Sequence, residues 1–277
     1  IIGPALGGLL TGAVGATSTL LVDAASFALL TIAVAFVRSR RPPAAAPDRA
    51  IGVGAWEGFR LLWRSPVLRI ALQVSAVATG CAVVDNVAAP FRFLDQLGTG
   101  DFGYGVYLTV WSAGALIGVQ LLPHLAPRHH GAALAAGNLL TGLGIAGIGV
   151  APSLAVAFAS SLVGGFGNGL VNVAQNVLIA AHTPREQHGR AFAAAAAVMQ
   201  AAIGIGTAAA APLVTTFGAG RAMAGAGALA ALAAAVGFVR LATATRSTPM
   251  TSAARGEGEI GVIEAGGHDT GNQTGAV

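Results

Sequence analysis

The sequence predicts an all-α integral membrane protein with seven whole transmembrane helices and a partial one at its N-terminus. Two observations carry this prediction: long apolar segments fill the chain, and arginine gathers in every second gap between them. Each segment approaches the ~20 residues that a helix needs to cross the hydrocarbon core. The seven segments are Ser18–Val37, Leu68–Phe91, Tyr104–Leu122, Gly131–Val150, Leu154–Ala181, Ala191–Leu213 and Arg221–Leu241.

A shorter apolar segment opens the chain at Ile1–Leu10. It is too short to span a bilayer, and the chain begins with Ile instead of Met. We therefore expect this segment to be the second half of a helix, and the chain to be a fragment.

Composition supports the membrane class and argues against several others. Hydrophobic residues make up 55% of the chain and charged residues only 9%, too few to cover the surface of a soluble domain. The 40 glycines are spread through the apolar segments, as expected where small residues let helices approach closely in lipid. All 15 basic residues are arginines and form no single basic face, which argues against a nucleic-acid partner. The single Cys81 excludes an intrachain disulfide.

The arginines also predict an orientation, because basic residues mark the cytoplasmic side of a membrane protein. The gap from Arg38 to Arg64 contains six arginines, whereas the next gap, around Thr99, carries acidic residues. Arginine returns in the gaps around His129 and Gln187 and in the C-terminal region. We expect a multi-pass protein of the cell inner (plasma) membrane with these gaps and the C-terminus in the cytoplasm.

The first arginine-rich gap predicts a linker followed by an interfacial helix. The prolines of Pro42–Pro47 favour an extended linker. Trp56, Phe59 and Trp63 then recur at helical spacing, with charged residues on the neighbouring face, which is typical of a helix lying among lipid headgroups. The alternative is a plain extension of the span that begins at Leu68.

Four local patterns resemble one known family. Gly3–Gly8 resembles the end of a glycine-proline motif on the fifth helix of that family, Trp63–Arg69 its entry to the seventh, and His182–Phe192 its loop between the tenth and eleventh. With Leu21–Phe27, these patterns resemble the major facilitator superfamily, in the branch of bacterial enterobactin-type exporters. One departure is Pro127, which replaces the acidic residue that the family often has between its eighth and ninth helices.

This resemblance implies two six-helix halves with a substrate site between them at mid-membrane. Residues 1–37 would be the end of the N-terminal half, with a partial and a whole helix, and residues 38–67 the cytoplasmic linker with the interfacial helix. Residues 68–241 would form the C-terminal six-helix half. Residues 242–277, rich in Gly, Thr and Ser, are expected to be a disordered cytoplasmic tail. The missing N-terminal half of the same carrier would be a partner of this chain.

Amide side chains form the clearest polar constellation inside a span. Asn168, Asn172 and Asn176 recur every four residues, and Gln175 lies one turn from Asn172. Polar groups at membrane depth are costly and face a cavity or a partner. The stripe therefore predicts a substrate path, with interhelical hydrogen bonding as the alternative.

Asp85 is the candidate for proton coupling, and Asn86 beside it is a further candidate for the substrate path. Both lie in the Leu68–Phe91 span, and the resemblance places that span and the Leu154–Ala181 span along the translocation path. Apolar surroundings such as Val83, Val84 and Val87 favour the neutral form of a carboxyl group, which suits binding and release of a proton. The alternative places Asp85 at a wetted vestibule edge, attracted to Arg92.

The loop before the Ala191–Leu213 span is predicted to have a structural role, as the cap of the helix that follows it. Thr183 is expected to cap the next helix, with Pro184 at the first helical position and Glu186 completing a capping box. The alternative is a direct role in gating.

The function expected from these features is secondary active export of a small organic molecule by alternating access, as a proton antiporter. The substrate and the lipid bilayer are its partners, and no cofactor or metal is expected. We predict no enzymatic activity, because the chain has no phosphate-binding loop with a lysine and no nucleophile elbow. The alternatives are a non-transporting membrane scaffold and a membrane enzyme whose catalytic part is missing.

Overall fold

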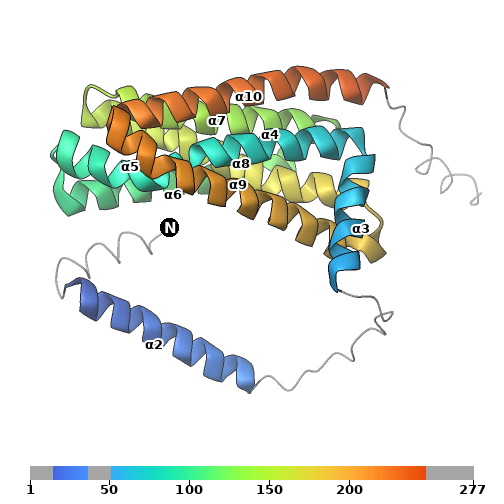
Figure 1. Ribbon diagram of the computed structural model, residues 1–277, viewed down its shortest axis with the longest axis horizontal. Helices are drawn as coiled ribbons and strands as arrows, with labels where there is room; N and C mark the ends of the chain where they lie inside the picture. The colour runs from blue at the N-terminus through green and yellow to red at the C-terminus, as the bar shows by residue number, and fades with distance from the viewer. Residues whose placement is uncertain (1–14, 37–50, 248–277) are drawn as a thin grey trace, which may run out of the picture.

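The computed structural model describes residues 15–36 and 51–247, and Figure 1 shows their arrangement. The expected partial helix at Ile1–Leu10, the Gly3–Gly8 motif and the prolines of Pro42–Pro47 lie outside the described residues. So does the expected tail from residue 248 onward. Residues 242–247, which we expect in that tail from the sequence, continue the last helix instead.

The described residues form α-helices joined by short turns, with no strand among them. The long helices are α2 (Ala16–Ala35), α3 (Ile51–Arg64), α4 (Pro66–Ala82), α5 (Val84–Phe91), α6 (Gly100–Leu121), α7 (His130–Val150), α8 (Leu154–His182), α9 (His188–Phe217) and α10 (Ala219–Ser247). Short turns of other helix types lie at Arg92–Gln96, Leu122–His124, Pro127–His129 and Arg185–Gln187.

Seven helical stretches of the described chain are long and apolar enough to cross a membrane. They confirm the number and order of the expected spans: Thr17–Ala35, Pro66–Gln96, Gly100–His124, Pro127–Val150, Leu154–His182, Arg185–Phe217 and Ala219–Arg240. The all-α membrane bundle predicted from the apolar segments is therefore confirmed.

Helices α4 to α10 run side by side in one bundle, and α3 lies across one of its ends (Figure 1). Helix α7 packs between α8 and α10, while α6 covers α8 and α9 packs on α4. Helix α2 lies apart from this bundle, and none of residues 17–35 is buried.

Glycines set how closely these helices approach. Gly114 and Gly118 of α6 lie against the backbone of α8, and Gly165 and Gly169 of α8 lie in turn against the backbone of α6. Small residues allow this contact, and lipid leaves close packing as a main source of helix association. The glycines spread through the apolar segments thus serve as contact surfaces.

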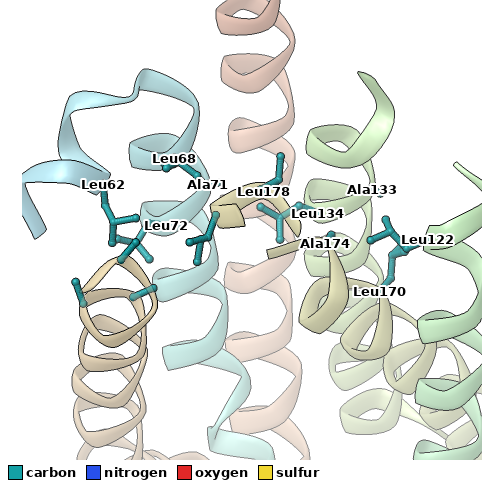
Figure 2. Packing of buried hydrophobic residues seen from close by; sticks show 14 residues of the cluster. Leu62, Leu68, Ala71, Leu72, Leu122, Ala133, Leu134, Leu170, Ala174 and Leu178 are labelled. Atoms are coloured by element: carbon teal, nitrogen blue, oxygen red, sulfur yellow. The ribbon is translucent and has the colours of Figure 1, made fainter. Parts of the chain in front are cut away.

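One apolar cluster gathers helix ends at the side of the bundle that carries α3, as Figure 2 shows. It joins Leu62 of α3 to Leu122 beyond the end of α6, Leu134 of α7, Leu178 near the end of α8 and Ala191 of α9. The turns that carry Arg128 and Arg185 therefore lie at the same end of the bundle as α3. This common end agrees with the alternation of arginine along the sequence.

One predicted element, the short helix before the second span, agrees with the structure, and another differs in detail. Helix α3 ends at Arg64, and the Ser65 hydroxyl accepts a hydrogen bond from the Leu68 amide to cap α4, so α3 is a separate helix and does not extend α4. The expected span Leu68–Phe91 is divided at Val83 into α4 and α5 and continues as a π-helical turn over Arg92–Gln96. Val83 keeps α-helical dihedral angles and its amide still donates to the Thr79 carbonyl, so Pro66–Gln96 remains one helical stretch.

Candidate transport cavity

A cavity of about 370 Å³, here called the central cavity, lies where the division between α4 and α5 faces α6, α7, α8 and α9. Its apolar wall includes Trp111, Ile145 and Ile203. Its polar lining consists of Thr79, Asp85, Asn86, Tyr107, Asn138, Thr141 and Asn168. One carboxyl group, three amides and several hydroxyls thus face a hollow inside a bundle of apolar helices.

Among the lining residues that the structure describes, Asp85 is the one with an ionisable carboxyl group. Its residue is only 6% exposed, and its Oδ2 accepts a hydrogen bond of 2.6 Å from the Tyr107 hydroxyl. Its Oδ1 has no hydrogen-bond partner among the described residues. A buried carboxyl oxygen without a partner is costly, so this atom is suited to accept a hydrogen bond from a ligand or to carry a proton.

Tyr107 is held in place by ring contacts. Its ring stacks on Phe93 at 4.5 Å between ring centroids, and Trp111 follows one turn later with its ring centroid 6.4 Å away. Phe93 is fully buried. The position of the hydroxyl that holds Asp85 is therefore fixed by the aromatic packing between α6 and the end of the divided span.

Arg92 does not pair with Asp85, although the two are on the same span. Its guanidinium donates to the carbonyl oxygens of Ile148 and Ala151 and to the Gln96 side chain. These bonds fasten the π-helical turn to the end of α7. Asp85 is buried, and the Arg92 guanidinium bonds to other groups. The structure therefore gives no support to the alternative of an exposed carboxylate attracted to Arg92.

The predicted amide stripe divides between two environments. Asn168 and Asn86 line the central cavity, together with Asp85. Asn172 donates to the carbonyl and the side-chain oxygen of Asn168, and Asn176 donates to the carbonyl of Asn172. Both of these are exposed and form no part of the cavity lining. The stripe thus reaches the cavity at Asn168 and continues from there along the surface of α8.

Gln175 lies away from the other candidates. It borders a small apolar gap beside Leu62, Leu68 and Leu72, where α3, α4 and α8 meet. The structure does not bring it together with Asp85.

Several polar residues of the cavity were not among the sequence candidates. Asn138 of α7 donates a hydrogen bond to Ser75 of α4 at 3.2 Å, and Thr141 lies one turn further along α7. Both are polar residues in an apolar span, which was the available signal. Tyr107 carried no comparable signal, because its role depends on Asp85, 22 residues away in the chain.

The expected capping box at Thr183 is wrong. The Thr183 hydroxyl donates back to the Ile179 carbonyl of α8 at 2.7 Å. A 3₁₀ turn over Arg185–Gln187 then precedes α9, which begins only at His188 and has no side-chain cap. The additional turn places Glu186 outside the first turn of α9, so the spacing of a capping box is lost.

The comparisons with known proteins agree with this architecture. A family model described as a transmembrane secretion effector, of the major facilitator type, matches residues 1–259. The chain belongs to this family. No solved structure matches the chain significantly.

One curated relative of the chain is the multidrug efflux pump Tap of Mycolicibacterium fortuitum. It is 28% identical over 227 residues, which cover 79% of the chain and 54% of the pump. Tap pumps of Mycobacterium tuberculosis strain H37Rv and of Mycobacterium bovis strain BCG are 27% identical over 224 residues. Each match covers 79% of the chain and 53% of the pump. The chain thus spans about half the length of the curated relatives it matches.

Proposed function

We propose that a carrier containing this chain exports small organic molecules across the plasma membrane by alternating access, in exchange for protons. The family and the Tap multidrug pumps support efflux as the direction and small molecules as the cargo. The division into residues 1–37, 38–67, 68–241 and 242–277 belongs to this proposal, with residues 242–247 counted as the end of α10. The resemblance to enterobactin-type exporters belongs to it as well.

The observation that carries the proposal is the buried carboxyl group of Asp85, in which one oxygen accepts a hydrogen bond and the other has no partner among the described residues. Tyr107 donates to Oδ2 and so fixes the orientation of the carboxyl group, while Oδ1 is left to bind a proton. A neutral carboxyl group is tolerated in an apolar bundle, and an ionised one needs a compensating donor or cation. A substrate that supplies hydrogen-bond donors beside Asn86 and Asn168 would take the place of the proton.

Exchange follows if the proton and the substrate exclude one another at this group. The substrate binds from the cytoplasm when Oδ1 is ionised, and protonation of Oδ1 from the other side removes its acceptor and favours release. Asn172, Gln175 and Asn176 are proposed as substrate-path residues along the remainder of α8, outside the central cavity.

The test of this function is transport by the purified carrier in proteoliposomes. We expect an outward-directed movement of drug that a pH gradient drives and a protonophore abolishes. Drug movement that persists unchanged without a proton gradient would argue for another energy source. A carrier that binds drugs but never moves them would support a scaffold.

Substitutions of Asn168 and of Gln73 should differ in their effect on substrate affinity. Asn168→Ala removes a hydrogen-bonding group from the central cavity, so the dissociation constant should rise about 3- to 30-fold, which corresponds to roughly 0.6–2 kcal/mol for one membrane-buried hydrogen bond. Gln73→Ala is the control, because Gln73 is an exposed amide of α4 outside the cavity lining. Equal effects of the two substitutions in an equilibrium binding assay would contradict a substrate site in this cavity.

The orientation is tested by labelling single cysteines in intact cells. In a Cys81→Ser background, cysteines at His129 or Gln187 should resist an impermeant thiol reagent, because arginine-rich turns stay in the cytoplasm. A cysteine at Thr99, at the other end of the bundle, should react. The reversed pattern would overturn the cytoplasmic placement of the C-terminus.

A further inference from the structure

A second polar cavity, of about 230 Å³, lies outside the transport path where α3 crosses the start of α9. It is here called the α3 cavity. Arg60 and Arg64 of α3 and Arg190 of α9 line it, and Glu57 is the one acidic residue among the described residues of the lining. Three guanidinium groups thus face one carboxylate, so the cavity carries an excess of positive charge.

The contact between α3 and α9 holds this cavity in shape. Gly58 lies directly against the backbone carbonyl of Arg190, so that a Cβ at this position would collide with it. Leu62, on the same side of α3, is only 1% exposed. The three arginines are therefore presented by two helices in fixed contact.

The ion pairing inside the cavity is incomplete. Arg190 donates to the Glu57 carboxylate at 2.7 Å. Within residues 15–36 and 51–247, no acidic side chain forms an ion pair with Arg60 or Arg64. Two guanidinium groups, one turn apart on one face of α3, are available to an anion that enters from outside the protein.

Aromatic residues mark the level at which this cavity meets the membrane. Trp56, Phe59 and Trp63 form a continuous stack along α3, with ring centroids 5.8 and 4.8 Å apart. Trp56 is 67% exposed and Trp63 39%. Tryptophan is enriched at the headgroup level of a bilayer, where one part of the ring is apolar and the other is wet. The stack thus runs beside the charged face, so tryptophans at headgroup level would bring these arginines close to the lipid phosphates.

We propose that the α3 cavity binds the phosphate group of an anionic phospholipid through Arg60 and Arg64. Guanidinium groups match phosphate oxygens with paired hydrogen bonds, and basic pockets between membrane helices suit lipid headgroups. The lipid would sit with its phosphate in the cavity and its acyl chains beside the tryptophans. Bound there, it would fasten α3 to α9 as an external counterion, in addition to the internal pair of Glu57 with Arg190.

The tryptophans themselves report on this site. The chain has three tryptophans, of which Trp56 and Trp63 lie on α3 beside Glu57 and Arg64 in the sequence and Trp111 lines the central cavity. In a Trp111→Phe background, the tryptophan fluorescence of this chain arises from α3 alone, and a brominated lipid quenches it more strongly the longer the lipid stays beside α3. Brominated phosphatidylglycerol should quench more strongly than brominated phosphatidylcholine at equal mole fraction.

Substitutions then assign this preference to named groups. Arg60→Gln and Arg64→Gln should each reduce the preference for phosphatidylglycerol about fivefold, the equivalent of about 1 kcal/mol for each arginine near an anionic surface. Glu57→Gln should strengthen it, because that substitution removes the competing carboxylate. Arg128→Gln, an exposed arginine in another turn at the same end, should leave it unchanged. Circular dichroism confirms that each variant keeps its helices.

The outcomes separate the possible sources of phosphate. If inorganic phosphate does not displace the brominated lipid, the cavity selects the lipid. If it does, the cavity recognises phosphate in either form, and the assignment to lipid is overturned. Equal quenching by both lipids, or a preference that survives the loss of both Arg60 and Arg64, would overturn the site altogether. These readouts do not require transport, so they stand apart from the proposed efflux.

Discussion

Asp85→Asn should abolish proton-driven uphill efflux and leave ligand binding and passive exchange measurable. The substitution keeps the size and polarity of the side chain, and the amide oxygen can still accept from Tyr107. Among the described residues, it removes the one carboxyl group of the central cavity lining, which is the group proposed to bind and release a proton. We expect complete loss of accumulation against a gradient in proteoliposomes, with counterflow of labelled drug retained.

Asp95→Asn is the matched control for this experiment. Asp95 is on the same span, in the π-helical turn, and is exposed. Its substitution should leave the coupled rate and its dependence on pH intact. If Asp85→Asn still drives uphill export with an unchanged pH profile, the proton-coupling role of Asp85 is wrong.

Gly169→Ala should destabilise the bundle, although alanine is the better helix former. A Cβ at Gly169 would meet the backbone of Ala115, which cannot move without separating α6 from α8. Overpacking of this kind costs about 1–3 kcal/mol, more than the ~1 kcal/mol that alanine gains over glycine inside a helix. We expect a lower thermal unfolding midpoint in detergent.

Gly204→Ala provides the comparison, because a Cβ at this position of α9 meets nothing within 4 Å. Its unfolding midpoint should be equal to or above that of the unmodified protein. If both substitutions have the same effect, the close approach of α6 and α8 does not stabilise the bundle.

Much of the fold follows from the sequence, because a lipid environment imposes strong rules on it. The seven spans were predictable, since hydrocarbon thickness fixes their length and each backbone must satisfy its own hydrogen bonds. The division at Val83 was not, because Leu68–Phe91 reads as one continuous apolar segment. The late start of α9 was missed because a 3₁₀ turn and a capped first turn share the same residue types around Pro184.

The candidate site was predictable only where a polar side chain is itself unusual. Asp85, Asn86 and Asn168 stand out in their apolar spans, and the structure places all three around one cavity. The spacing of the amides did not indicate that Asn172 and Asn176 leave that cavity, since a helix face turns gradually relative to its neighbours. The role of Tyr107 could not be predicted, because it depends on how α6 packs against the divided span. The periodicity of the sequence does not reveal that packing.

The central claim is that a proton and a substrate exclude one another at Asp85, and proton release on ligand binding tests it most directly. The purified carrier is placed in weakly buffered detergent with a pH indicator, and the ligand is the drug that best stabilises it in a thermal screen. Binding to the unmodified carrier and to Asp95→Asn should release protons into solution, and binding to Asp85→Asn should release none. Equal proton release from the Asp85→Asn carrier would contradict the mechanism.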